Sequence, residues 1–453
     1  MVTDVRGLAL TGTDYSGAQK YQDVIQKLYD YRPNLGSYLQ PLIDEYPEFI
    51  MARVVLAYGM ASEGRYSSLV NVAIKGSELN SLREGATERE SLHIDAVNTW
   101  SKGDLKGAIE IWDAILAKWP FDLVAFRQMT MNLFWMGQRR RLADLCARLM
   151  PYWDETTPDY GFFIGPVGFV MEELGQYSLA EKYARRAVEL NPSDMWAVHA
   201  VAHVLEMQGR NEEGIDWIEP KSHVFHEHNA FVGHLWWHLS LFHLESGNVD
   251  KVLSLFDQQV YPGNSDFYLD IQNGASLLSR LSFIGVDVGD RWKKLLEAVE
   301  NAKLDYVYDF TDIHNAIVLA RNERFGELKS MNDQLSRRLS SSDHDPWLTY
   351  QLTKAIEDIH MGDPARAADR LAPIRYDQLA LGGSHAQQDL FLQYQIMAYR
   401  NSENLPMMKA ALKERLAKRI IGNDVDGYLT KARQIDSLTL NDSITPYLQK
   451  VSG

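Results

Sequence analysis

The 453-residue chain repeats one local pattern. The segments GDLKGAIEIWDAILAKWPFDLVAF (103–126) and GQYSLAEKYARRAVELNPSDMWAV (175–198) each contain a glycine, an amphipathic helical pattern, a proline and then an aspartate. Apolar residues three and four positions apart form one stripe on a helix, proline ends a helix, and aspartate caps the next one. A single helix pair cannot bury its apolar stripe, so such units must stack on one another.

Other segments fit the same register, and alternating strand patterns are scarce. Similar glycines precede helical patterns at Gly137, Gly209, Gly247 and Gly362. We therefore predict an all-α fold, an α-solenoid of tetratricopeptide-like helix pairs that forms a curved superhelix with capping helices at both ends.

The regularity of the pattern suggests four regions. We expect an N-terminal helical cap at 1–85, tetratricopeptide-like repeats at 86–257, irregular helical repeats at 258–345, and C-terminal helical repeats with a cap at 346–453. The polar stretch SSSDHD (340–345) is the best candidate for a break.

Composition excludes several classes of partner. The formal net charge of −15 would repel nucleic acids and anionic membranes. Cys146 is the single cysteine, which rules out an internal disulfide and fits a reducing compartment. No window reaches the roughly 18 apolar residues that a membrane-spanning helix needs. We expect a cytoplasmic protein without nucleic-acid or membrane partners.

The histidines are the chain's most informative polar residues. His199 and His203 are four positions apart, as are His234 and His238, so each pair shares one helix face. Corresponding members of the two pairs are 35 positions apart, close to one repeat, and each pair precedes a repeat glycine. We therefore expect all four imidazoles to face one groove on the concave side of the solenoid.

Two interpretations of this pattern stay open. Each histidine can be a half-buried structural residue whose ring nitrogens are satisfied by neighbours. Alternatively, the four can bind a divalent metal or a polar ligand, or move protons, because crowded imidazoles are costly unless something organises them. Ala200 and Leu235 occupy the positions where the zinc metalloprotease motif has glutamate, so that mechanism is not supported.

Other polar positions are less specific. His223, His226 and His228 fall in a segment that we expect to be a solvated loop, and His243 is expected to be packed near a helix end. Asp312 and His314 lie at an expected helix start. Cys146 is expected in the core. GGSHAQQDLF (382–391) combines two glycines with an N-cap serine, and a helix start of this kind can hold an anion.

Several ordered motifs resemble the tetratricopeptide repeat protein 38 family. They are ERESLHIDAV (88–97), WAVHAVAHVLEM (196–207), HLWWH (234–238), VGDRW (288–292), FTDIHN (310–315) and LAPIRY through LGGSHAQQDLF (371–391). The resemblance covers residues 85–430 and implies a helical-repeat fold without a firmly assigned reaction. It implies recurring polar positions at His93, His199, His203, Glu206, His234, Trp237, His238, Asp312, His314, Gly382, Gly383, Ser384, Gln387 and Asp389.

The functional hypothesis is a small-molecule pocket on the concave face. His199, His203, His234, His238 and His314 would form it as catalytic residues, with Asp312 orienting an imidazole, and the first four are also the candidate ligands of a divalent metal. The substrate-binding candidates are His93, Trp237, Gly383, Ser384, Gln387 and Asp389, with the amides of Gly383 and Ser384 receiving an anionic group. Such a site suits a hydrolase or another acid/base or metal-dependent enzyme. The alternative is a non-catalytic scaffold that binds a protein or peptide, and the sequence also allows a homo-oligomer.

Overall fold

A computed structural model describes residues 2–263, 265–302, 305, 307–338, 346–420 and 425–449. The described chain is helical apart from a two-residue antiparallel strand pair, β1 (Val2–Thr3) and β2 (Ala9–Leu10), so the all-α prediction is confirmed. The expected break at 340–345 lies outside the described residues. The helices of the described part include none that is long and apolar enough to cross a membrane.

The chain divides into two compact units. Unit 1 comprises Met1–Val201 and Val224–Val232, and unit 2 comprises Ala202–His223 and Gly233–Gly453. The boundary falls within α11 (Met195–Met207), one continuous helix to which both units contribute.

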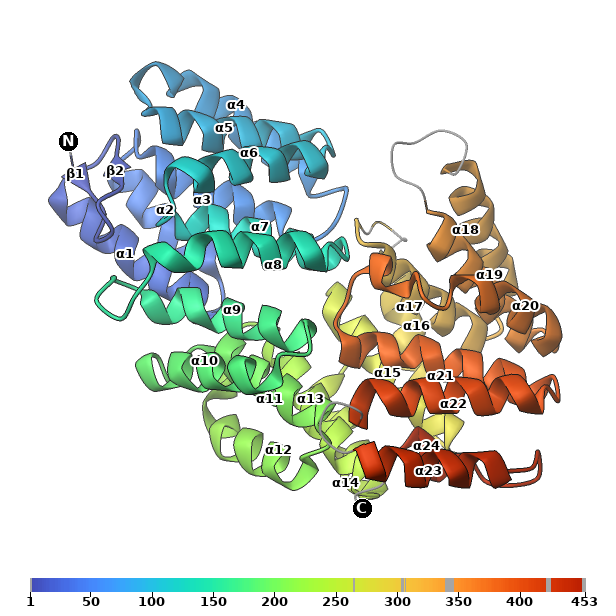
Figure 1. Cartoon of the computed structure of the whole chain (residues 1–453). Helices are drawn as coiled ribbons and strands as arrows, with labels where there is room; N and C mark the ends of the chain where they lie inside the picture. The colour runs from blue at the N-terminus through green and yellow to red at the C-terminus, as the bar shows by residue number, and fades with distance from the viewer. Residues whose placement is uncertain are drawn as a thin grey trace. The chain divides into compact units, whose positions relative to one another are not determined.

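Unit 1 consists of successive helices that pack in sequence order (Figure 1). They are α1 (Tyr15–Tyr29), α2 (Leu35–Glu45), α3 (Ile50–Ala61), α4 (Leu69–Ser81), α5 (Glu88–Ser101), α6 (Leu105–Lys118), α7 (Leu123–Trp135), α8 (Arg139–Leu149), α9 (Tyr160–Glu173) and α10 (Tyr177–Leu190), with short 3₁₀ turns η1 (Arg83–Gly85) and η2 (Met150–Tyr152). The 3₁₀ segment η3 (Glu219–Glu227) begins in unit 2 and ends in unit 1.

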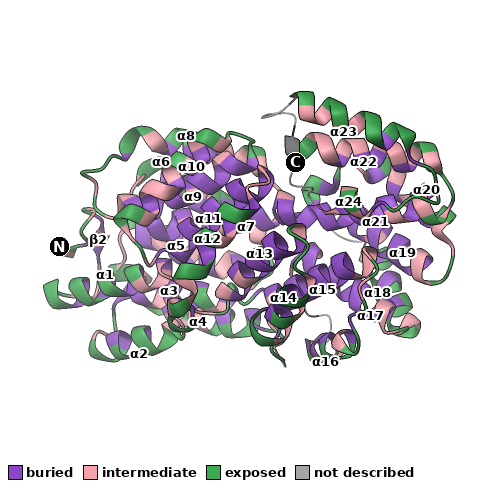
Figure 2. Cartoon of the chain, turned by 90° about the horizontal axis from the view of Figure 1, so that it is seen from below, coloured by how far each residue is buried: buried purple, intermediate pink, exposed green. Residues whose placement is uncertain are grey.

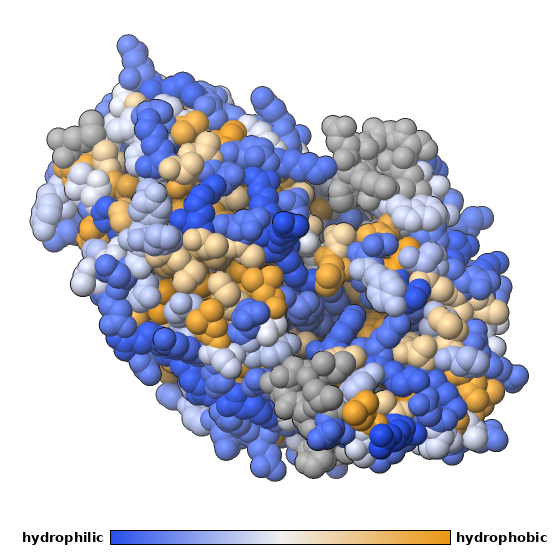
Figure 3. Space-filling view, viewed as in Figure 1, coloured by the Kyte–Doolittle hydropathy of each residue, from blue (hydrophilic) through white to orange (hydrophobic). Residues whose placement is uncertain are grey.

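Unit 2 continues in the same way. Its helices are α12 (Asn211–Ile218), α13 (Val232–Glu245), α14 (Val249–Leu255), α15 (Tyr268–Phe283), α16 (Arg291–Ala302), α17 (Asp309–Arg321), α18 (Phe325–Arg338), α19 (Trp347–His360), α20 (Pro364–Ile374), α21 (His385–Asn401), α22 (Leu405–Ile420), α23 (Val425–Ser437) and α24 (Thr445–Leu448), with η4 (Phe256–Val260) and η5 (Gln378–Leu381). Nearly every side chain of α15 and α17 is buried, whereas hydrophilic side chains cover α12 (Figures 2 and 3).

The repeat glycines stand where the sequence pattern places them. Each follows the first helix of a pair and has a positive φ: Gly103, Gly137, Gly175, Gly209, Gly247 and Gly362. A left-handed residue directly after a helix reverses the chain, and glycine adopts that conformation without a steric penalty. The helix-pair architecture predicted from the recurrence is therefore present.

The α9–α10 pair packs through small residues. Gly161, Gly165 and Gly168 of α9 form one stripe, and Ala180, Ala184 and Ala187 are the buried residues of α10. A Cβ atom at Gly168 would lie 2.9 Å from the backbone nitrogen of Ala184. Because backbone cannot move aside as a flexible side chain can, this contact requires glycine.

Gly168→Ala is accordingly expected to lower the free energy of unfolding by about 1–3 kcal/mol, the usual range for overpacking. The matched control is Gly59→Ala in α3, where a Cβ atom would meet nothing within 4 Å. Gly59→Ala should be neutral or stabilise by up to about 1 kcal/mol because alanine favours the helix. Urea unfolding of both variants measures the difference, and equal effects would contradict this description of the packing.

Candidate histidine site

Three buried histidines meet in unit 2. His203 lies on α11, and His234 and His238 lie one turn apart on α13. The ring centroids of His203 and His238 are 4.5 Å apart, and those of His234 and His238 are 4.8 Å apart. Each ring offers a nitrogen within 4.8 Å of the others, and His199, one turn before His203 on the same helix, completes this group. We call these four residues the histidine cluster.

Hydrogen bonds at Nδ1 orient two of the rings, those of His234 and His238. Nδ1 of His234 lies 2.7 Å from Oδ1 of Asn273 on α15, and Nδ1 of His238 lies 2.8 Å from Oε2 of Glu206 on α11. An acceptor at Nδ1 fixes the tautomer in which Nδ1 carries the proton. In both residues Nε2 is then the nitrogen that can accept a metal or a proton.

Burial keeps His234 neutral. The pKa of His234 is lowered to about 3, first by burial and then by the neighbouring His238. A neutral imidazole is the form that coordinates a metal, so near pH 7 metal binding would not have to displace a proton from His234.

Trp237 lies between His234 of the cluster and the buried Arg280. Its ring stacks on His234 at 4.9 Å between centroids, and the guanidinium of Arg280 lies 5.5 Å from the Trp237 ring centroid. Arg280 donates to the carbonyl oxygen of Ala386 and lies 3.9 Å from Asp389. Trp237 and Asp389, distant in sequence, therefore flank the same arginine.

The interior near the cluster contains polar atoms without protein partners. Among the described residues, Nε1 of Trp237 and Nδ2 of Asn273, both on side chains that contact His234, are buried and lack a hydrogen-bond partner. Buried polar atoms are normally satisfied, so these positions call for ordered water or a polar ligand.

The Gly-Gly-Ser segment forms the predicted helix start. Gly382 and Gly383 have positive φ, and a Cβ atom at Gly383 would lie 2.6 Å from the ring of Phe310. Ser384 caps α21 in a capping box, in which its amide donates to Oε1 of Gln387. The Ser384 amide, which we expected to bind an anion, therefore already donates to a side chain of its own helix.

The Asp389 carboxylate is bound by side chains of unit 2. Arg415 donates to both of its carboxylate oxygens, and Gln393 donates to one of them. The carboxylate thereby holds α22 against α21 inside unit 2. Its expected role in substrate binding stays a prediction.

His314 is buried in α17. Its Nδ1 lies 2.7 Å from the carbonyl oxygen of Phe310, and Asp312 lies in the first turn of the same helix. Burial, reinforced by Arg280, lowers the pKa of His314 to about 4. Neither residue belongs to the histidine cluster as the distances define it.

His314 should make unit 2 sensitive to acid. Between pH 6.5 and about 4, His314 is protonated in the unfolded chain but stays neutral in the folded chain. Protonation therefore stabilises the unfolded state, and the free energy of unfolding decreases as pH falls through this range. We expect the stability advantage of the wild type over His314→Gln to shrink by about 2–3 kcal/mol between pH 7.5 and 4.5. Urea titrations at both pH values test this, with exposed His226→Gln as the control. A pH-independent difference for His314→Gln would contradict it.

His93 belongs to a different network, in unit 1. Its Nε2 lies 3.0 Å from Oδ2 of Asp122, and its Nδ1 lies 3.0 Å from the hydroxyl of Tyr58. Arg89 donates to the same Asp122 oxygen, and Trp112 donates to Tyr58. Both ring nitrogens of His93 are therefore engaged within the core of unit 1.

The other polar positions predicted from the sequence differ in how far they are buried. The expected loop is instead the 3₁₀ segment η3, on which His223 and His226 are exposed as predicted. His228, just after it, is buried, with Nδ1 2.7 Å from the carbonyl oxygen of Asp30. His243 is packed as predicted. Cys146 lies in the core, where burial raises its thiol pKa to about 12 and makes it unreactive.

Asn273, Arg280 and Arg415 are polar residues around this site that the sequence did not single out. Asn273 stands beside Gln272 near the middle of α15, and two adjacent amides in a helix interior are the signal that could have identified it. Nothing local in the sequence distinguishes the two arginines.

No family model matches the chain. Among solved structures, one titled "Structure of Naa15/Naa10 bound to HypK-THB" aligns over 93% of this chain and 80% of the other, at 12% identity and a TM-score of 0.21. A TM-score this low carries no conclusion about function. Membership of the tetratricopeptide repeat protein 38 family stays a prediction.

Proposed function

We propose that the histidine cluster binds a divalent transition metal, with zinc as the favoured ion. The observation that carries this proposal is the convergence of buried imidazoles from two helices, with Nδ1 of His234 and His238 anchored by Asn273 and Glu206. Zinc sites commonly use histidines that donate their other nitrogen to a carboxylate or an amide oxygen.

The nitrogens of the four histidines need only small shifts to coordinate one ion. Nitrogens bound to tetrahedral zinc at 2.0–2.1 Å lie about 3.4 Å from one another. The nitrogens of the cluster lie within 4.8 Å of one another, so side-chain shifts on the order of 1 Å would complete the coordination. The all-nitrogen ligand set excludes calcium and magnesium, which prefer oxygen ligands.

Metal content tests the proposal. Purified protein, reconstituted with zinc and dialysed, should retain about one zinc per chain. The His234→Ala/His238→Ala variant should retain none, whereas the exposed pair His223→Ala/His226→Ala should behave like the wild type. Circular dichroism of the apo proteins shows whether the variants fold, and chelator competition on the wild type measures affinity without any variant. Absence of retained zinc in the wild type would refute the proposal.

His199 determines what such a metal could do. Four histidine ligands close the coordination shell and make a structural site, whereas three leave a position for water and allow hydrolysis. If His199→Ala leaves zinc affinity unchanged, the fourth position is open and the hydrolase hypothesis gains support. A large loss of affinity identifies His199 as a ligand and favours a structural metal in a helical-repeat scaffold.

A further inference from the structure

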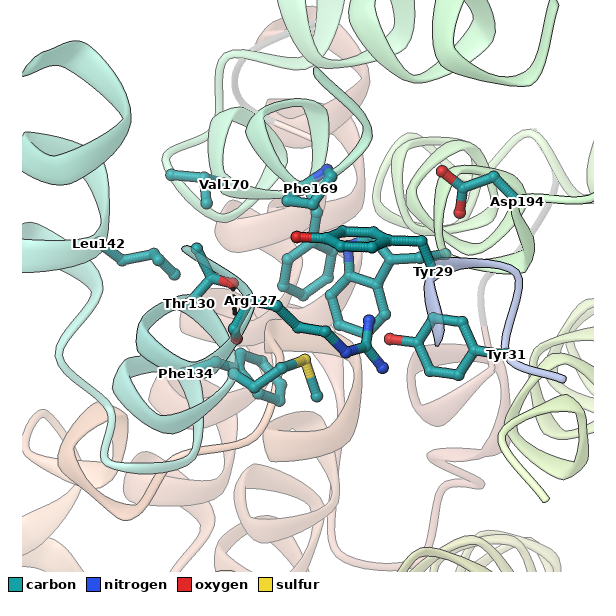
Figure 4. A pocket seen from close by; sticks show the side chains of 12 residues that line it. Tyr29, Tyr31, Arg127, Thr130, Phe134, Leu142, Phe169, Val170 and Asp194 are labelled. Carbon is teal, nitrogen blue, oxygen red and sulfur yellow. Dashed lines mark hydrogen bonds between the residues drawn. The ribbon is translucent and has the colours of Figure 1, made fainter. Parts of the chain in front are cut away.

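Two hollows in the described part of unit 1 differ greatly in size. In the hollow beside Arg127, the centres of water molecules can occupy only about 20 Å³, and the rings of Phe134 and Phe169 touch at 5.4 Å between centroids (Figure 4). In a cleft formed by the ends of α1 and α10 and the start of α9, they can occupy about 430 Å³. Only this second hollow, which we call the Asp30 cleft, has room for a ligand. It is independent of the metal proposal.

The walls of this cleft combine apolar and polar side chains. Tyr160 and Phe162 come from the start of α9, and Leu190, at the end of α10, is 42% exposed. Gln26 and Asn191 contribute side-chain amides. Small-molecule sites have this composition, in which apolar side chains cover most of the ligand and a few polar groups orient it.

Two of the three carboxylates in the cleft already have a cation as a partner. Arginines contact both Asp159 and Glu155. Asp30 accepts a hydrogen bond from Nδ2 of Asn191 at 2.8 Å, but no cationic group among the described residues lies within 4.0 Å of its carboxylate. The Asp30 carboxylate is therefore the negative charge that the cleft leaves uncompensated.

The basic residues closest to Asp30 have other partners. The ammonium of Lys27 lies over an aromatic ring of α2, and Arg32 pairs with Glu227 at 2.7 Å. Nδ1 of His228 lies 2.7 Å from the carbonyl oxygen of Asp30, but burial lowers the pKa of this histidine, so it is neutral at pH 7. A cation for the Asp30 carboxylate must therefore come from outside the described chain.

Two helix ends add to the negative potential of the cleft. Asp30 caps the C-terminus of α1, and Asn191 caps the C-terminus of α10. The C-terminal end of a helix carries a partial negative charge of roughly half an elementary charge, which favours a cation nearby. The helix ends and the carboxylate thus act in the same direction.

We infer that the Asp30 cleft binds a primary ammonium that carries an apolar body. The ammonium donates to the Asp30 carboxylate, and the apolar body lies against Tyr160, Phe162 and Leu190. One uncompensated carboxylate suits a monovalent cation better than a polyamine. It also suits an organic cation better than calcium, which takes about six to eight oxygen ligands.

A ligand-observed NMR titration with 2-phenylethylammonium tests this inference. Its controls are 2-phenylethanol, which has a similar shape but no charge, and methylammonium, which lacks the apolar body. We expect one saturable site per chain with a Kd on the order of 1 mM or tighter. Each control should bind about tenfold more weakly, because it lacks either the ion pair or the apolar contact.

Asp30→Asn isolates the charge, because its side-chain oxygen can still accept from Asn191. We expect it to bind 2-phenylethylammonium about tenfold more weakly, with binding of 2-phenylethanol unchanged. The matched control is Asp144→Asn, which removes an exposed carboxylate on α8 and should leave both affinities unchanged.

Circular dichroism shows whether Asp30→Asn folds, and if it does not, the three probes on the wild type decide alone. The absence of saturable binding would overturn the inference. So would equal binding of 2-phenylethylammonium and either control, or full binding by a folded Asp30→Asn variant.

Discussion

Glu206→Ala is expected to weaken zinc binding by about 10–100-fold, the usual effect of removing the residue that holds a metal-binding histidine from behind. The carboxylate of Glu206 lies 2.8 Å from Nδ1 of His238 and is buried with it. It orients the ring and makes Nε2 a stronger donor to the metal. Glu206→Gln should have a smaller effect, because its amide oxygen still accepts from Nδ1 but carries no charge.

Chelator competition at a fixed pH and salt concentration measures these affinities. The matched control is Glu213→Gln on α12, where an exposed carboxylate pairs with Arg210. Affinity that is unchanged in Glu206→Ala would show that the hydrogen bond to His238 has no part in metal binding, and it would count against the orientation we assign to this ring.

Asp122→Ala should cause the largest loss of stability, about 3–5 kcal/mol, because it leaves a buried cation without its partner. One carboxylate oxygen contacts Arg89 and His93, and the other accepts from the amide of Ala125 at the start of α7. Burial alone would raise the pKa of Asp122, but His93 and Arg89 outweigh it and lower the pKa. The stabilisation is therefore complete at neutral pH and is lost only as pH falls below about 3.9.

Asp104 provides a matched control for this effect. It caps α6 through the same hydrogen bond to a backbone amide, at Gly107, but it is exposed and outside any buried network. Asp104→Ala should cost only about 1 kcal/mol, the value of the cap itself. Denaturant unfolding of both variants isolates the buried network, and similar losses would show that capping accounts for the whole contribution of Asp122.

The sequence predicted the helix pairs and the meeting of the histidines for the same physical reason. A period near 35 residues places equivalent helices side by side, and the i, i+4 spacing places His234 and His238 on one face. The histidines come together because of these two periodicities, and both can be counted in the sequence.

The surroundings of the cluster could not be predicted in this way. Asn273 and Arg280 come from α15, outside the regular repeats, and the sequence does not indicate which helix packs against α13. His93 shares with the other histidines only the family resemblance, and its engagement by Tyr58 and Asp122 depends on contacts across three helices.

X-ray absorption at the zinc edge of the reconstituted wild-type protein tests the central claim most directly. We predict three or four nitrogen ligands at about 2.0–2.1 Å with the outer-shell scattering of imidazole rings. That scattering should disappear in the His234→Ala/His238→Ala variant. A spectrum of hydrated or oxygen-ligated zinc in the wild type, or an unchanged spectrum in the double variant, would contradict metal binding by the histidine cluster.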